Sequence, residues 1–263
     1  MVGHCLYFTG QVAAAVPWYQ RAVAASERGD VHGLVDHESL STSMSMVGHC
    51  LYNTGAVDAA LPWFERAIAA SERGDVHGRV NHHSIGRNMH CVGYCLWTTG
   101  HVAAALPWFE RAISEKEKGD IHGLVGRESL GRSLHQVGHC VQITGDVAAA
   151  LPWFERGIAE KEKGDIHGRV DHDSVAASMR DLGQCLQKTG DFAAALPWFE
   201  RAVTESEKGD KYGRVNHESL GASLRAAANC SRELGLRDKA KELDELASGL
   251  EESAGDRAEP LRT

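Results

Sequence analysis

The chain has 263 residues, a formal net charge of −8 and 24% charged residues. Because non-specific nucleic-acid binding needs a basic surface, this mildly acidic balance predicts no nucleic-acid partner. The sequence holds no apolar run near the roughly 18 residues of a membrane span. It begins without the charged segment and cleavage site of a signal peptide, so we expect a cytoplasmic protein that makes no membrane contact.

A fixed period organises the sequence. The tryptophans of a recurring Pro-Trp pair are spaced by 45 residues, at Trp18, Trp63, Trp108, Trp153 and Trp198. A Gly-Asp pair and a Gly-x-Cys element keep the same spacing, so the seven cysteines are expected to be reduced thiols at equivalent places. A constant period of this length predicts a repeat architecture, in which each unit buries its apolar face only against its neighbours.

The first unit, approximately residues 1–30, starts inside what should be a helix, just before Val2. We therefore expect it to be truncated, either natively or because the chain is a piece of a larger protein. Apolar residues between Met1 and Phe8 support an alternative function, in which this open repeat stacks on another chain and self-association is the purpose of the protein.

Four units follow, at approximately 38–75, 83–120, 128–165 and 173–210, and each predicts two helices. In the fourth unit of the chain, a first helix has one apolar face, made by Leu130, Leu134, Val137 and Val141. Gly145 should end this helix and Asp146 should cap a second one. The second apolar face holds Ala150, Phe154, Gly157 and Ile158, and Lys161 and Lys163 should lie near the negative end of the helix dipole.

The recurring stretch "LPWFERA" places a proline early in each second helix, for example Pro152. Proline removes one backbone hydrogen bond, here to the carbonyl of Ala148, so we expect a bend that directs Trp153 and Phe154 at neighbouring helices. The alternative is that recent duplication copied a proline that packing does not require.

The last unit, approximately 218–248, has a polar second helix without Pro-Trp, which suits the exposed end of an array. Residues 249–263 are predicted to form a disordered C-terminal tail. The units thus predict an all-α repeat domain over residues 1–248.

The pattern of Leu134, Val137, Gly138, Val141, Ala150 and Phe154 resembles the tetratricopeptide repeat (TPR). The glycine and alanine would be small because the two helices cross closely there. The period is 45 rather than the usual 34 residues, and the usual proline between units is missing, which resembles the longer kinesin-light-chain type. The resemblance implies a right-handed α-α superhelical solenoid of helical hairpins whose first helices line a concave groove.

Repeats of this type also occur as sensor arrays on bacterial signalling ATPases. The resemblance therefore implies a non-enzymatic scaffold that binds a protein or peptide, as the sensor or adaptor part of a larger signalling protein. No phosphate-binding loop, nucleophile elbow or carboxylate pair is present in the sequence, so we expect neither an enzyme nor a cofactor.

The face of the first helices that lies opposite the apolar one varies among units and carries basic, amide and aromatic residues with almost no acid. This pattern predicts a groove for a peptide with an acidic segment or a free C-terminus, since arginine binds carboxylates bidentately and Tyr94 and Trp97 are flat anchors. The alternatives are a solvated face that drifted and a Trp97 that packs on a neighbouring helix. The predicted groove residues are His49, Tyr52, Arg87, His90, Tyr94, Trp97, Arg132, His135, His139, Gln142, Arg180, Gln184, Lys188, Arg225 and Asn229.

The histidines and cysteines do not predict a metal site. Cys91 and Cys95 have the best spacing, but equivalent residues of successive units should lie roughly 10 Å apart, far beyond a zinc ligand sphere. Recurring "HGxVxH" loops contain His32, His77, His122 and His167. They form either a ladder open to a partner or to protonation, or simple local turns with glycine at positive φ and Asp or Asn as helix caps.

Overall fold

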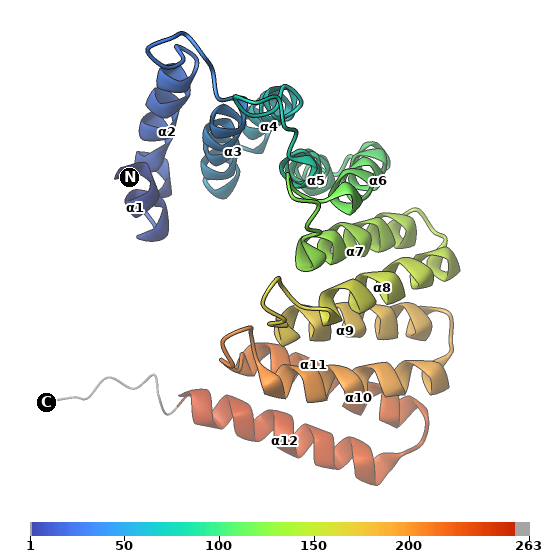
Figure 1. Ribbon diagram of the computed structural model, residues 1–263. Helices are drawn as coiled ribbons and strands as arrows, with labels where there is room; N and C mark the ends of the chain where they lie inside the picture. Colours follow the sequence, from blue (N-terminus) through green and yellow to red (C-terminus); the bar gives the residue numbers. More distant parts are fainter. Residues whose placement is uncertain (1, 256–263) are drawn as a thin grey trace, which may run out of the picture. The chain divides into compact units, whose positions relative to one another are not determined.

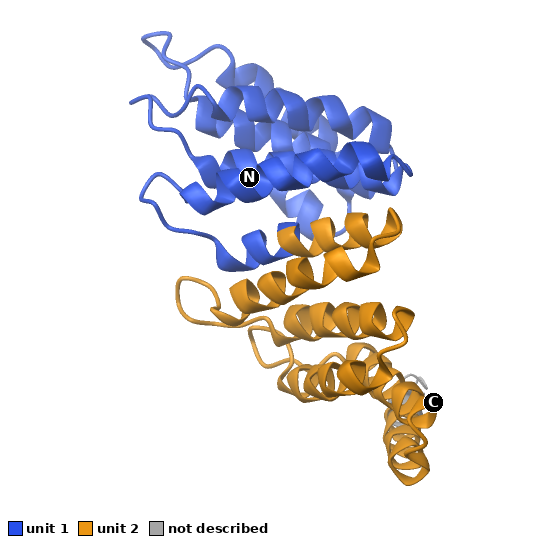
Figure 2. Cartoon of the chain, turned by 90° about the vertical axis from the view of Figure 1, so that its right-hand side faces the viewer, with its two compact units in different colours: residues 1–133 blue, residues 134–263 orange. Residues whose placement is uncertain are grey.

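A computed structural model describes residues 2–255, with side chains described as far as residue 250. It divides into two compact units, Met1–Ser133 and Leu134–Thr263, each considered by itself (Figure 2). Below, the first and second unit are these two parts of the chain, and the 45-residue modules are called repeats. The described residues form α-helices and connecting turns, with no strand among them. No helix in this part of the chain combines the length and apolar character that crossing a membrane requires.

The helices follow one another as hairpins, in the order that the period predicts (Figure 1). Odd-numbered helices are the first and even-numbered helices the second of each repeat. Their bounds are α1 Val2–Phe8, α2 Val12–Ser26, α3 His37–Asn53, α4 Val57–Ser71, α5 His82–Thr98, α6 Val102–Lys118, α7 Arg127–Ile143, α8 Val147–Glu162, α9 His172–Lys188, α10 Phe192–Lys208, α11 His217–Glu233 and α12 Arg237–Gly255.

Helix boundaries arise from the capping residues that the sequence indicates. At the start of α9, the Asp171 carboxylate accepts a hydrogen bond from the backbone N–H of Ser174. The tight turn to the second helix uses a glycine at positive φ, as at Gly190, and Asp191 then caps α10. Asp146 caps α8 in the same way, as predicted.

The crossing of first and second helices depends on a glycine opposite a phenylalanine, as the sequence predicts. Phe154 is fully buried, and a Cβ atom at Gly138 would lie 2.9 Å from its Cε1. The same arrangement joins Gly48 to Phe64 in the first unit. Real Cβ atoms essentially never approach so closely, so only glycine allows these helices to pack at this distance.

The prolines lie inside continuous second helices, on their exposed face. The Ala148 carbonyl, left without a donor by Pro152, belongs to an exposed residue, so water can replace the lost bond. The bend itself stays a prediction. The neighbouring tryptophans are only partly buried or exposed, and an arginine three residues on stacks over four of them, for example Arg66 over Trp63 at 4.5 Å.

One sequence prediction needs correction, and the place of a second residue is refined. α12 continues to Gly255, so the boundary of the tail at 249 is placed too early; residues 256–263 of that segment lie outside the described residues. Lys161 lies in the last turn of α8, near the negative end of the helix dipole as predicted, and its side chain is buried at 5% exposure. Lys163 does stay exposed, and pairs with Glu160 at 2.7 Å.

The Gly-Asp loops form local turns. In each of them the carboxylate of the aspartate accepts the backbone N–H two residues on, as Asp75 does from His77 at 2.8 Å. Gly78 has a positive φ, and the first loop histidines are exposed. His82, at the start of α5, instead contacts Glu115 of α6 at 2.7 Å, within the same repeat. These contacts agree with the local-turn interpretation.

Candidate functional site

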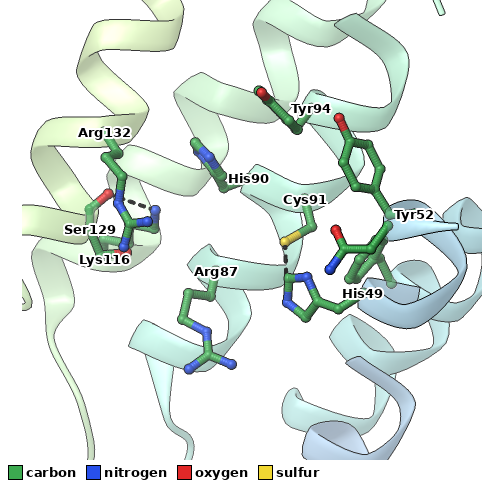
Figure 3. Close-up of a pocket in the computed structure, with 11 residues that line it drawn as sticks. His49, Tyr52, Arg87, His90, Cys91, Tyr94, Lys116, Ser129 and Arg132 are labelled. Atoms are coloured by element: carbon green, nitrogen blue, oxygen red, sulfur yellow. Dashed lines mark hydrogen bonds between the residues drawn. The ribbon is translucent and has the colours of Figure 1, made fainter. Parts of the chain in front are cut away.

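The first unit contains a pocket of about 420 Å³ on the first helices of consecutive repeats. Figure 3 shows side chains from α3, α5 and α7 converging on it. Six of the fifteen predicted groove residues line this pocket: His49, Tyr52, Arg87, His90, Tyr94 and Arg132. It is also lined by Asn53, Phe64, Cys91, Lys116 and Ser129, which the sequence analysis did not select.

Aromatic rings form one part of the pocket wall. Tyr52 of α3 and Tyr94 of α5 lie with ring centroids 5.5 Å apart. Tyr94 also stacks on Trp97, one turn along its helix, at 5.7 Å. Trp97 is partly buried and does not line the pocket, so it supports the Tyr94 ring from behind rather than forming an exposed anchor.

Basic side chains form the other part of the pocket wall. Arg87 and Arg132 are both exposed, and Arg132 has only a loose contact with Glu128, at 3.7 Å. Lys116 lies beneath them at 1% exposure, and its Nζ donates to the Ser129 carbonyl at 2.8 Å (Figure 3). Among the described residues that line the pocket there is no carboxylate. Two exposed guanidinium groups therefore face a cavity that contains no counter-charge of its own.

The pocket histidines are neutral at pH 7. Burial, followed by the nearby charge of Lys116, holds the pKa of His90 well below its usual value. Burial and then Arg87 lower the pKa of His49 to about 4. His90 Nδ1 lies 3.0 Å from the Ser133 hydroxyl, and His49 Nε2 lies 3.9 Å from the Cys91 sulfur. These side chains are more enclosed than a solvated face would allow.

The buried lysine is the principal residue that sequence reasoning missed. Burial, followed by the charge of Arg132, lowers the pKa of Lys116 to about 7. Its Nζ also donates to the Ser133 hydroxyl at 2.7 Å, so it joins α6 to α7. The signal was present, because Lys116 follows the buried Ala112 and Ile113 at helical spacing and so lies on the apolar face.

The other predicted groove residues serve several purposes in the second unit. Arg180 of α9 donates to the Ser219 carbonyl at 3.3 Å and the Ser223 hydroxyl at 2.8 Å of α11, which is a contact between repeats. Gln142 donates to the sulfur of Cys185. His135 and His139 lie beside Asp181. The remaining predicted groove residues of this unit are exposed: Gln184, Lys188, Arg225 and Asn229.

Comparison with known proteins agrees with the repeat pattern. Residues 175–208 match the tetratricopeptide repeat family model. A search of curated proteins returns no match.

Solved structures share the fold. BtubC (BKLC) from P. vanneervenii aligns with a TM-score of 0.75 at 13% identity, covering 96% of this chain and 95% of that one. A putative kinesin light chain from Podosopora anserina, described as having nearly identical TPR-like repeats, gives 0.59 at 22% identity over 81% and 95%. YrrB, described as a TPR protein with an unusual peptide-binding site, gives 0.52 at 13% identity over 88% and 91%.

The family match falls within a unit that the 45-residue period repeats along the chain, and the fold is that of the TPR-like repeats of the kinesin light chain. The chain therefore has an all-α repeat solenoid fold similar to that of tetratricopeptide repeat structures, and one of its repeats matches the tetratricopeptide repeat family model.

Proposed function

We propose that the protein is a non-enzymatic scaffold that binds a peptide segment of another protein in the pocket of its first unit. The observation that carries the proposal is the pairing of two exposed arginines, Arg87 and Arg132, with an aromatic wall in a pocket without a carboxylate. Guanidinium groups form bidentate hydrogen bonds with carboxylates. Tyr52 and Tyr94 add flat surface that loses little conformational entropy on binding.

The pocket favours a segment that has an acidic side chain or a free C-terminus next to an apolar residue. A carboxylate would lie between the arginines, and the apolar residue would contact the tyrosines. The buried Lys116, whose pKa is about 7, adds a partial positive charge beneath this position, and salt screens this enclosed charge little. YrrB, a structurally similar TPR protein with an unusual peptide-binding site, supports the same use of this fold.

Selection from a displayed library of random linear peptides tests the proposal. Selected sequences should be enriched in Asp or Glu, or in a free C-terminal carboxylate, beside an apolar residue. Their affinities, measured by fluorescence polarisation, should fall about tenfold or more in Arg87→Glu and in Arg132→Glu, because one charge-assisted hydrogen bond contributes about 1.5–3 kcal/mol. The loss should be smaller at high salt.

Arg111→Glu is the matched control. Arg111 is exposed and stacks on Trp108 of α6 at 4.7 Å, away from the pocket. The control makes the same change of charge and should leave the affinity within about twofold, roughly 0.4 kcal/mol. Selected peptides without acidic character, or equal losses in all three variants, would show that the pocket is not the binding site.

Self-association through the first repeat is a second candidate function. Phe8 is 72% exposed and Val2 is 49% exposed on α1, whose only buried residue among those described is Gly3. An apolar helix surface of this kind can stack on the end of another array. Mass measurement at two concentrations distinguishes the candidates, because a self-assembling chain gains mass with concentration and Phe8→Glu should abolish the gain.

A further inference from the structure

A cluster of three potential metal ligands lies in the second unit, outside the pocket. His135 and His139 project from the same side of α7, one turn apart, and Asp181 comes from α9. The Nε2 atoms of the two imidazoles are 3.0 Å apart. The Oδ2 atom of Asp181 lies 3.1 Å from Nε2 of His135 and 3.4 Å from Nε2 of His139. Three potential ligand atoms therefore surround one common position.

The spacing matches a metal coordination sphere. With zinc–ligand distances of about 2.0–2.1 Å, two ligand atoms of a tetrahedral site lie about 3.3 Å apart. The three separations here, 3.0, 3.1 and 3.4 Å, are close to that edge length. A metal ion at 2.0–2.1 Å from all three atoms fits just outside their plane, with small adjustments of the side chains.

Hydrogen bonding alone accounts poorly for the cluster. A neutral imidazole carries one N–H, so two Nε2 atoms at 3.0 Å need one donor and one acceptor. If both nitrogens donate to Asp181, their hydrogens converge on one oxygen atom and on each other. If one Nε2–H donates to the other Nε2, that hydrogen is used and the accepting nitrogen has none, so neither imidazole donates to the carboxylate. A cation at the centre uses all three lone pairs at once.

The charge balance also favours a cation. Among the described residues, the two imidazoles are the only ion-pair partners of the Asp181 carboxylate, which is 24% exposed. The carboxylate is thus largely enclosed, with the two imidazoles beside it. A divalent ion between the three groups would offset its negative charge.

The surroundings hold the ligands in place and leave an open side. The fully buried ring of Phe154 packs against both imidazoles in a T-shaped arrangement. The ring centroids lie 5.2 Å apart for His135 and 5.3 Å apart for His139. The ligand side chains are 12%, 25% and 24% exposed, in the order His135, His139 and Asp181. Water can therefore complete the coordination, as in zinc sites with three protein ligands.

The three ligand types coincide at one pair of repeats only. One repeat earlier in the sequence, the corresponding residues are His90, Tyr94 and Gln136, and two repeats earlier they are Ser45, His49 and Cys91. One repeat later they are Arg180, Gln184 and Ala226. Random change of a solvent-exposed face would not be expected to bring these three ligand types together. Here two histidines meet an aspartate that lies 42 residues after the second of them.

We propose that His135, His139 and Asp181 bind a divalent transition metal ion, with zinc as the natural occupant. Two imidazoles and one carboxylate are ligands that zinc prefers. The ion joins α7 to α9, so it stabilises the packing of successive repeats in this unit. One coordination position remains for water. The site is independent of the peptide pocket, which uses residues of the first unit.

Metal titration of the full chain without a polyhistidine tag tests this proposal. The protein is stripped with a chelator, dialysed under reducing conditions and titrated with Zn²⁺ by calorimetry and with Co²⁺ by visible absorption. We expect one equivalent of each ion. The Co²⁺ spectrum should show d–d bands but no thiolate charge-transfer band. Zn²⁺ should raise the melting temperature, since an ion that binds the folded state stabilises it.

Three variants locate the ion. Asp181→Asn keeps the shape of the side chain and should weaken Zn²⁺ binding at least tenfold, as should His139→Gln. His167→Gln, which removes an exposed loop imidazole of the same unit, should bind like the unchanged chain. Circular dichroism shows whether each variant is helical. If Asp181→Asn does not fold, His139→Gln still tests the site, because its side chain is 25% exposed and its substitution disturbs the core less. Absence of a stoichiometric site, thiolate bands, or unchanged affinity in both ligand variants overturns the proposal.

Discussion

The Lys161 ammonium group on α8 donates a hydrogen bond of 2.7 Å to the Ser178 hydroxyl on α9. It also donates to the Ser174 carbonyl at 3.0 Å, so this one buried cation joins two successive repeats. Lys116 makes the same pair of contacts to Ser129 and Ser133 in the first unit. A lysine inside a helical core is costly unless all of its donors find acceptors, which explains why these serines lie opposite it.

Lys161→Ala should reduce the free energy of unfolding by about 2–4 kcal/mol, because the variant leaves a cavity where the methylene stem was and removes the donor to the Ser174 carbonyl. Urea unfolding followed by circular dichroism measures the change. Lys163→Ala is the control, since Lys163 is exposed and its pair with Glu160 should be worth less than about 0.5 kcal/mol. Equal effects of the two substitutions would contradict the structural role of Lys161.

The close contact between Gly138 and Phe154 predicts that Gly138→Ala destabilises the chain, although alanine has the higher helix propensity. The added Cβ would lie 2.9 Å from the ring, and overpacking of this kind costs about 1–3 kcal/mol. Thermal unfolding detects the change.

Gly249→Ala provides the opposite expectation. Gly249 lies in α12, and nothing is within 4 Å of the position of an added Cβ. This variant should gain up to about 1 kcal/mol from helix propensity alone. A stabilising Gly138→Ala would show that the two helices can separate without cost.

Acid should destabilise the first unit through His49. Its pKa is about 4 in the folded chain because of burial and then Arg87, while the unfolded value is near 6.5. Between these values the unfolded state binds more protons, so stability is full above pH 6.5 and falls as the pH drops towards 4. The loss from this one histidine is at most about 3 kcal/mol.

Comparison with His49→Gln isolates that contribution, because glutamine does not titrate. Unfolding free energies of both chains are measured at about pH 7.5 and about pH 4.5. The variant should lose less stability on acidification than the unchanged chain. Parallel losses would mean that His49 is protonated in the folded state without penalty.

The repeat pattern was sufficient to predict the hairpins, since it fixes local features. Gly145 and Asp146 mark the turn, and the spacing of Phe154 from Ala150 places both in the core. Lys161 was missed because lysine is rarely buried, even though it falls on the apolar face three residues after Ile158. The usual exposure of lysine predicts a side chain in solvent, whereas the position of Lys161 on the apolar face of α8 predicts a buried one.

The metal cluster was missed for a different reason. The spacing of His135 and His139 is visible on one helix, but the third ligand, Asp181, lies in the next repeat. Equivalent positions of neighbouring repeats were expected to lie too far apart to share an ion. Asp181 is not at an equivalent position, and its offset of 42 rather than 45 residues from His139 places the carboxylate 3.4 Å from the imidazole.

The polar contacts are not the same at every junction between repeats, and this has a consequence for assembly. Near-identical modules risk joining in the wrong order or swapping between chains. Lys116 and Lys161 supply the cation from the preceding helix, whereas at the junction with Ser206 the cation is Arg180, from one repeat earlier. A lysine-bearing hairpin docked there would force two cations onto one set of oxygen atoms. Such a mismatch penalises this wrong pairing and so limits which of the otherwise similar modules can exchange places.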